Sequence, residues 1–455
     1  MIRIILIPVL LAFAFAGEAQ DSFIQTITDF NISRYNGVFP SNDDLITFGI
    51  FLDTTGSTMV RKTSITGETQ WTWKAGRYTL GISCGVADRD GNLYLCRYRN
   101  DSESVMLKLS PAGDSLWQRP LPGKTPDHIS YTHDNHFLLL SQVANGITLS
   151  KTDLEGNVLW TRQISHIDLD DEMTGLTHIE MSDETILAVS QSTDPLYNDY
   201  LTRFQLFSAN GDSLHEFAFT SFNPPQKVLS VCRINSTDVL ITGICTGELY
   251  EDQSFIARVN VSSGAVVWQK TLLEDLLNSR LLIAGASDDK ALLSGVVQFT
   301  VNVPQQALSM GINFDGDILF YRGYGENVIH EVAGVCLASD GGIVAAGSTY
   351  YNSNVKGFMM KTDRDGFVNV LGFVTEPGLL PLSCYPNPAE DLLCIEAVAG
   401  IRMVELFDAT GRLVGRFGFN GEVNVTVPLQ DLRPGLLTVK VLHDLGTSLK
   451  KIIAK

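Results

Sequence analysis

Two short signatures alternate along the chain and set its pattern of apolar and polar positions. One is a polar turn that leads into an apolar strand, as in Asp90-Gly91-Asn92-Leu93. The other is a glycine turn with a large apolar residue four positions later. Each occurs seven times, with a polar turn before every glycine turn. The glycine turns and the residues that follow them are Gly67 and Trp71, Gly113 and Trp117, Gly156 and Trp160, Gly211 and His215, Gly264 and Trp268, Gly316 and Phe320, and Gly366 and Val370.

The spacing of these signatures predicts a β-propeller. Asp-Gly turns between apolar runs indicate β-hairpins, because glycine adopts positive φ without steric cost. Successive glycine turns lie 46, 43, 55, 53, 52 and 50 residues apart, and about fifty residues is the size of a four-stranded blade. We therefore expect an all-β chain with a seven-bladed propeller over residues 20–375. In each unit, an outer pair of strands joined by the polar turn precedes a middle strand and a final strand.

Four tryptophans occupy the same place in their units. We expect Trp71, Trp117, Trp160 and Trp268 to pack as wedges between neighbouring blades. In two other units this place is taken by a histidine or a valine. Because these residues share bulk but no reactive group, the position favours packing over chemistry.

The N-terminus has the pattern of a secretory signal peptide. Arg3 precedes an apolar run from Ile4 to Ala16, and Gly17-Glu18-Ala19 is a small-x-small cleavage site. We expect residues 1–19 to be removed before Gln20, with Ala14-Phe15-Ala16 as the alternative site. The apolar run is too short to span a bilayer, and no other stretch could do so. The mature chain is therefore expected to have no membrane span.

The net charge limits the partners of the protein. The formal charge is -18, and it lies in the region between the signal peptide and residue 384, because residues 384–455 hold equal numbers of basic and acidic residues. An acidic surface repels phosphates and anionic lipids, so nucleic-acid and peripheral membrane binding are not expected.

The C-terminal region carries four separated motifs. They are Tyr385-Pro386-Asn387-Pro388 with Ala389-Glu390-Asp391, then Phe407-Asp408-Ala409-Thr410-Gly411-Arg412, then Leu429-Gln430-Asp431-Leu432-Arg433-Pro434-Gly435, and finally Lys450-Lys451-Ile452-Ile453-Ala454-Lys455. In order and spacing they closely resemble the C-terminal sorting domain of the type IX (Por) secretion system of the Bacteroidetes. The resemblance implies a sorting motif of Tyr385, Pro386, Asn387, Pro388, Asp408, Gly411, Arg412, Leu432, Gly435, Lys450 and Lys451. It also implies that the protein engages the type IX machinery and is secreted or attached to the outer-membrane surface.

The same region is expected to form a small antiparallel β-sandwich. Its apolar runs are short and alternate with turn signals; they are Leu392 to Ile395, Met403 to Phe407, Val423 to Val427, Leu436 to Val441 and Leu449 to Ile453. Residues 376–383 carry two prolines and a glycine and are typical of a linker. The sorting domain would then be residues 384–455. In the family, the domain is commonly cleaved near such a junction.

The repeats resemble those of quinoprotein-like propellers. The resemblance rests on Val86 to Leu95, which includes Asp90-Gly91-Asn92, and on Gly113-Asp114-Ser115-Leu116-Trp117. It is specific for the fold alone. No vicinal cysteine pair and no ligand set of the quinoprotein enzymes can be matched here, so no cofactor is expected.

Three local patterns could indicate chemistry, but each has a simpler interpretation. Gly81-Ile82-Ser83-Cys84-Gly85 matches the string of a serine-hydrolase elbow, which requires a strand, a strained turn and a helix; here a hairpin follows. His128, His133 and His136 could gather a metal, yet their spacing matches no established site. The acidic run 168–172 lacks the glycine and the final glutamate of a calcium loop. We assign no catalytic or metal-binding residue.

The seven cysteines are all in the exported part of the chain, where disulfides can form. Cys84 and Cys96 lie symmetrically about the Asp90-Gly91 turn, so strand pairing could place them opposite one another, and a disulfide between them is possible.

The other cysteines give weaker candidates. These are Cys232 with Cys245, and Cys384 with Cys394. Cys232 and Cys336 fall at equivalent positions in their units, which favours buried packing. At least one thiol stays unpaired in a monomer.

Three functions stay open at this point. The favoured one is a secreted or cell-surface module that binds a protein or a glycan. The alternatives are a glycan-active enzyme with a site assembled from several blades and a structural component of an extracellular layer. Fold cannot choose among them, because propellers host all three. Carboxylates gathered in the central channel would favour an enzyme, and exposed aromatics on one face would favour binding.

Overall fold

The computed structural model describes residues 22–368 and 382–455, except for the segments 27–31, 53–56, 76–80, 101–102, 122–124, 144–145, 167–171, 195–198, 220–225, 247–251, 274–276, 288, 299–304, 325–328, 352–353, 409–411, 431, 433 and 444–445. The predicted signal peptide, most of the acidic run and most of the predicted linker thus lie outside the described residues. The chain divides into two compact units between Asn369 and Val370. In the described part, no helix is long and apolar enough to cross a membrane.

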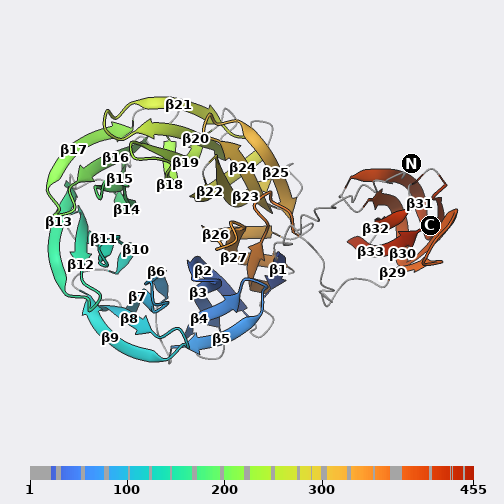
Figure 1. Ribbon diagram of the computed structural model, residues 1–455, viewed down its shortest axis with the longest axis horizontal. Helices are drawn as coiled ribbons and strands as arrows, with labels where there is room; N and C mark the ends of the chain where they lie inside the picture. Colours follow the sequence, from blue (N-terminus) through green and yellow to red (C-terminus); the bar gives the residue numbers. More distant parts are fainter. Residues whose placement is uncertain are drawn as a thin grey trace, which may run out of the picture. The chain divides into compact units, whose positions relative to one another are not determined.

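The first unit is a ring of seven four-stranded antiparallel sheets, numbered here as blades 1–7 (Figure 1). Blades 1–3 consist of β2 (Ile32–Ser41), β3 (Asp44–Leu52), β4 (Ser57–Ser64) and β5 (Thr69–Lys74); β6 (Ile82–Ala87), β7 (Leu93–Asn100), β8 (Glu103–Leu109) and β9 (Ser115–Leu121); and β10 (Pro126–Tyr131), β11 (Phe137–Val143), β12 (Gly146–Thr152) and β13 (Val158–His166). Blades 4–6 consist of β14 (Glu172–Glu180), β15 (Ile186–Asp194), β16 (Asp199–Phe207) and β17 (Ser213–Phe219); β18 (Gln226–Arg233), β19 (Asp238–Thr246), β20 (Asp252–Asn260) and β21 (Val266–Thr271); and β22 (Leu277–Ala286), β23 (Lys290–Gln298), β24 (Gln306–Asn313) and β25 (Ile318–Tyr324). Blade 7 consists of β26 (Ile329–Leu337), β27 (Ile343–Tyr351), β28 (Asn354–Lys361) and β1 (Phe23–Thr26). The predicted all-β, seven-bladed propeller is confirmed.

Within each blade the first strand faces the centre of the ring and the last strand lies at its rim (Figure 1). The prediction that the polar turn joins an outer pair of strands is therefore wrong, because this turn joins the innermost strand to its neighbour. Consecutive antiparallel strands reverse direction, so the polar turns and the glycine turns lie on one face of the ring. We call this the tight-turn face. The connections on the opposite face lie mostly outside the described residues.

The ring is closed by the N-terminal strand. β1 pairs with β28, with Phe23 opposite Lys361, and forms the outermost strand of blade 7. The sequence pattern predicted that a strand after Gly366 would fill this place with Val370, and this expectation is wrong. Phe23 is 7 % exposed and occupies the wedge position instead.

Seven hydrophobic clusters hold the ring together, and each joins two neighbouring blades. The cluster between blades 7 and 1 combines Phe23 with Phe51 and Val344. Because every blade buries side chains against both neighbours, the blades stabilise one another around the whole circle.

The four predicted tryptophans occupy equivalent, half-buried positions. Each follows an irregularity in its outer strand and lies opposite a basic residue of the third strand: Trp71 opposite Lys62, Trp117 opposite Lys108, Trp160 opposite Lys151, and Trp268 opposite Arg258. Trp71 and Trp268 donate their ring N–H to carbonyls of the next blade, at Pro111 and Phe314 respectively, both at 3.0 Å.

Most wedge aromatics cover a glycine turn of the next blade. A Cβ added to Gly113 would lie 2.9 Å from Trp71, and one added to Gly211 would lie 2.9 Å from Trp160. In blade 4 the covering ring is Phe217, which lies over Gly264, and not the exposed His215. Glycine is thus required by positive φ and by the close approach of the neighbouring ring.

Replacing Gly211 by Ala should destabilise the propeller by about 2–4 kcal/mol, because positive φ and contact with Trp160 both oppose the new methyl group. Gly156→Ala provides a matched control, since Gly156 has the same φ of 82° with nothing within 4 Å of the added Cβ. It should cost only about 1 kcal/mol. Denaturant unfolding of both variants measures the difference, and equal losses would show that wedge contact contributes nothing.

The second unit is an antiparallel β-structure around one hydrophobic core. Its strands are β29 (Leu382–Tyr385), β30 (Leu392–Phe407), β31 (Leu413–Pro428), β32 (Gly435–His443) and β33 (Gly446–Ala454). The first two predicted apolar runs form one long strand, β30, which pairs with β29 in its first part and with β32 in its second.

Candidate functional site

Acidic residues of the polar turns are bound to cations of the third strand in four blades. Asp134 is 2.7 Å from Lys151, and Asp340 is 2.6 Å from the fully buried Lys361. The pairs Asp44 with Lys62 and Asp238 with Arg258 repeat the arrangement. Hydrogen bonds from Lys151, Thr132 and His136 outweigh desolvation and lower the pKa of Asp134 to about 2. Repetition in the equivalent turns of four blades indicates that these carboxylates hold the turns in place.

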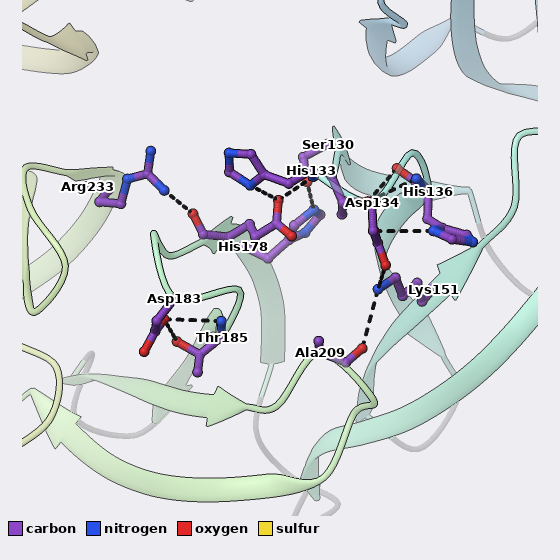
Figure 2. A network of polar contacts seen from close by, with 12 residues as sticks. Ser130, His133, Asp134, His136, Lys151, His178, Asp183, Thr185, Ala209 and Arg233 are labelled. Carbon is purple, nitrogen blue, oxygen red and sulfur yellow. Dashed lines mark hydrogen bonds and ion pairs between the residues drawn. The ribbon is translucent and has the colours of Figure 1, made fainter.

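The three histidines near the blade 3 hairpin are not gathered. His133 contacts Glu180 at 2.7 Å, His136 contacts Asp134 at 3.2 Å, and His128 points to blade 4. Figure 2 shows His133 and His136 reaching different partners, with Arg233 bound to the backbone of Glu180. In the described residues, no three or more histidine, cysteine or acidic side chains are close enough to share a metal ion.

A histidine pair, with His178 buried and His128 half-buried, joins the innermost strands of blades 3 and 4. The Nδ1 atoms of His128 and His178 are 3.3 Å apart, and the Ser130 hydroxyl is 2.7 Å from Nε2 of His178. Desolvation lowers the pKa of His128 to about 4 and that of His178 well below its usual range. Ser130 and His178 have the separation of a nucleophile and its base, but a strongly lowered pKa makes His178 a weak base. Sequence reasoning missed His178 because its partner lies fifty residues away.

Ser83 of the elbow-like string is structural. It lies within β6, and its hydroxyl donates to the Pro126 carbonyl at 2.7 Å, which belongs to the next blade. In the described residues a hairpin partner, β7, and not a helix, follows this strand. The side chain therefore links two blades.

Register places Cys84 directly opposite Cys96. Both thiols are buried and unbridged, and a hydrogen bond with Cys84, together with burial, raises the pKa of Cys96. The weaker candidate pairs are not opposite: Cys232 faces Leu240, and Cys384 faces Ile395. The structure thus favours one candidate pair over the others.

We expect Cys84 and Cys96 to be joined by a disulfide in protein recovered from outside the cell. Thiol counting in denaturant should then find two more reactive groups after reduction than before it. Cys96→Ser should lower the free energy of unfolding by about 2–4 kcal/mol through loss of the crosslink. Reducing agent should destabilise the wild type and leave this variant unchanged; equal thiol counts before and after reduction would contradict the expectation.

His330 is a second buried imidazole, and the pattern gave no signal for it. It lies on β26 beside Phe358, is 7 % exposed, and neither ring nitrogen has a partner in the described residues. Burial lowers its pKa to about 4.

This burial predicts acid sensitivity. The unfolded chain takes up a proton on this side chain near pH 6.5, whereas the folded protein does so near pH 4. The contribution of neutral His330 to the free energy of unfolding is therefore fully present above about pH 6.5. It falls by roughly 3 kcal/mol as the pH falls to about 4. Replacing His330 by Leu should flatten this part of the stability profile measured by denaturant unfolding. The same replacement at exposed His215 is the control, and equal profiles for both variants would contradict the prediction.

The predicted sorting residues hold the C-terminal strand. Asn387 Oδ1 accepts a hydrogen bond from the Ile453 amide at 2.9 Å, and Ala389 exchanges backbone bonds with Ile453 and Lys455. Lys450 donates to the Leu382 carbonyl at 3.0 Å. The motifs at the two ends of the region therefore meet in one structural frame.

The remaining sorting residues occupy turns and strand ends. Asp408 accepts from the Arg412 amide, Leu432 donates to the Leu429 carbonyl, and Gly435 begins β32. Tyr385 is 45 % exposed. Pro386 and Pro388 lie between β29 and β30, and Lys451 lies within β33, opposite Thr438. Gly411 lies outside the described residues.

The family described as a secretion system C-terminal sorting domain matches residues 383–455. The C-terminal region is a type IX secretion sorting domain. This sorting domain marks the protein as secreted or attached to the cell surface. No curated protein matches the chain.

Solved structures with a similar fold are distant. The WD40 β-propeller domain of Doa1 has 13% identity and a TM-score of 0.47, covering 74% of this chain and 95% of that one. A Drosophila Plexin A structure, in complex with Semaphorin 1b, has 8% identity and a TM-score of 0.43, covering 75% and 86%.

Proposed function

We propose that this sorting-domain protein is an exported binding module whose propeller binds a protein or a glycan. The observation that carries the proposal is the repeated structural use of its polar side chains. Asp134, Asp238 and Asp340 fix equivalent turns, and Ser83 and Arg233 bind backbone of neighbouring blades. These polar side chains thus support a rigid scaffold, which suits recognition by exposed surfaces.

Charge supports a protein partner with a basic surface. Nine exposed carboxylates of the tight-turn face form no ion pair with another described residue: Asp43, Glu68, Asp90, Asp114, Asp183, Glu184, Asp212, Asp289 and Asp315. Such a surface attracts cations and repels anionic glycans.

The proposal includes the processing steps that the sequence predicts. Residues 1–19 would be a signal peptide, residues 20–375 the propeller, 376–383 the linker and 384–455 the sorting domain, in a member of the Bacteroidetes. Cleavage before Gln20 would leave β1 intact for ring closure.

The test is a binding screen and an activity screen on the same mature protein. Neutral, anionic and cationic glycans and basic and acidic proteins are applied at two salt concentrations, because charge-driven binding weakens with salt. We expect a salt-sensitive protein ligand and no turnover on hydrolase or dehydrogenase substrates. Asp127 and Glu331 lie on the innermost strands β10 and β26. If the wild type shows turnover, and Asp127→Asn or Glu331→Gln abolishes it while the control Glu68→Gln keeps it, the enzyme alternative is established.

A further inference from the structure

The His128 and His178 rings approach each other through a contact between their Nδ1 atoms. The two rings come from neighbouring innermost strands, β10 and β14, and their centroids are 4.5 Å apart at an angle of 76°. His178 is 1 % exposed, while His128 is partly exposed. The like atoms of the two rings, Nδ1 and Nδ1, face each other at 3.3 Å.

This separation matches two ligands of one tetrahedral metal ion. With Zn–N bonds of about 2.0–2.1 Å at the tetrahedral angle, the two nitrogens would be about 3.4 Å apart. The separation of the two nitrogens would therefore change little on binding, while the rings would turn to direct both Nδ1 lone pairs at the ion.

The outer nitrogen of each ring has a hydroxyl partner. Nε2 of His178 is 2.7 Å from the Ser130 hydroxyl, and Nε2 of His128 is 3.4 Å from the Thr177 hydroxyl. Figure 2 shows Ser130 beside the His178 ring. A hydrogen bond at the outer nitrogen fixes the ring and leaves the lone pair of the other nitrogen for a metal.

We propose that His128 and His178 bind one divalent transition-metal ion, with Zn²⁺ the best fit, between blades 3 and 4. Water completes the coordination on the partly exposed His128 side, because no third histidine, cysteine or acidic side chain of the described residues is close enough. The ion clamps two neighbouring innermost strands. Its water positions are open to a donor atom of a bound ligand, such as a carboxylate.

The test uses the untagged mature chain and zinc chloride as the probe. Isothermal titration should find one Zn²⁺ per chain, and saturating Zn²⁺ should raise the thermal midpoint, because an ion that binds only the folded state stabilises it. His128→Gln should weaken binding at least tenfold. His133→Gln is the matched control, since His133 is an exposed histidine in the same blade, and it should leave the affinity unchanged.

A variant-free measurement covers the case in which His128→Gln does not fold. Nitrogen-15 spectra of histidine side chains in the wild type should show Nδ1 shifts of two residues on addition of Zn²⁺.

A second variant tests the role of the outer nitrogen. Ser130→Ala should weaken binding about tenfold by freeing the His178 ring. No binding by the wild type, equal losses in the His128 and His133 variants, or no Nδ1 shift would each overturn the proposal.

Discussion

Deletion of residues 20–26 is expected to open the propeller ring. β1 supplies the outermost strand of blade 7, and Phe23 belongs to the core between blades 7 and 1. Without it, β28 has an unpaired edge and the glycine turn at Gly67 loses its covering ring. Phe23→Ala alone should cost about 3–5 kcal/mol, the range for a buried aromatic residue. The deletion should cost more, because four paired residues are lost as well.

Denaturant unfolding and limited proteolysis measure this effect. The control is Thr26→Ala, which changes an exposed residue of the same strand. If Phe23 holds blades 7 and 1 together, protease should cut the Phe23→Ala variant in blade 7 or blade 1 earlier than it cuts the wild type. Unchanged stability in the deletion variant would show that another segment closes the ring.

Deletion of residues 384–455 is expected to leave a folded propeller inside the cell envelope. Blade 7 is complete at β28 and β1, and its glycine turn ends at Phe367. The sorting domain therefore contributes no strand to the ring, whereas it carries the export signal. We expect the truncated protein to be absent from the medium and cell surface and to accumulate in the periplasm with an unchanged thermal midpoint.

Fractionation followed by quantitative immunodetection checks this expectation. The matched experiment attaches residues 376–455 to an unrelated folded reporter, which should then leave the cell. Normal amounts of truncated protein outside the cell would show that export does not depend on the sorting domain. An unfolded truncated protein would contradict the expectation that the propeller folds without it.

The candidate sites differ in how far apart in the sequence their contacting residues lie. Cys84 and Cys96 share one hairpin, so turn symmetry alone predicted their pairing register. His128 and His178 lie in different blades, and no local spacing could indicate their contact. The sorting motifs are intermediate, since their order identified the domain but only the structure shows Asn387 bonded to Ile453.

The sequence by itself determined the number of blades, because each blade repeats the same turns and apolar alternation within about fifty residues. It also determined the sorting domain, whose motifs are read in order along the chain. Only the tertiary structure decided which strand closes the ring. Strand pairing between Phe23 and Lys361 spans nearly the whole propeller, and no local pattern encodes a partner at that distance. The same physical reason applies to Phe217 and His178, because contacts between blades depend on how complete sheets pack and not on the residues of one sheet.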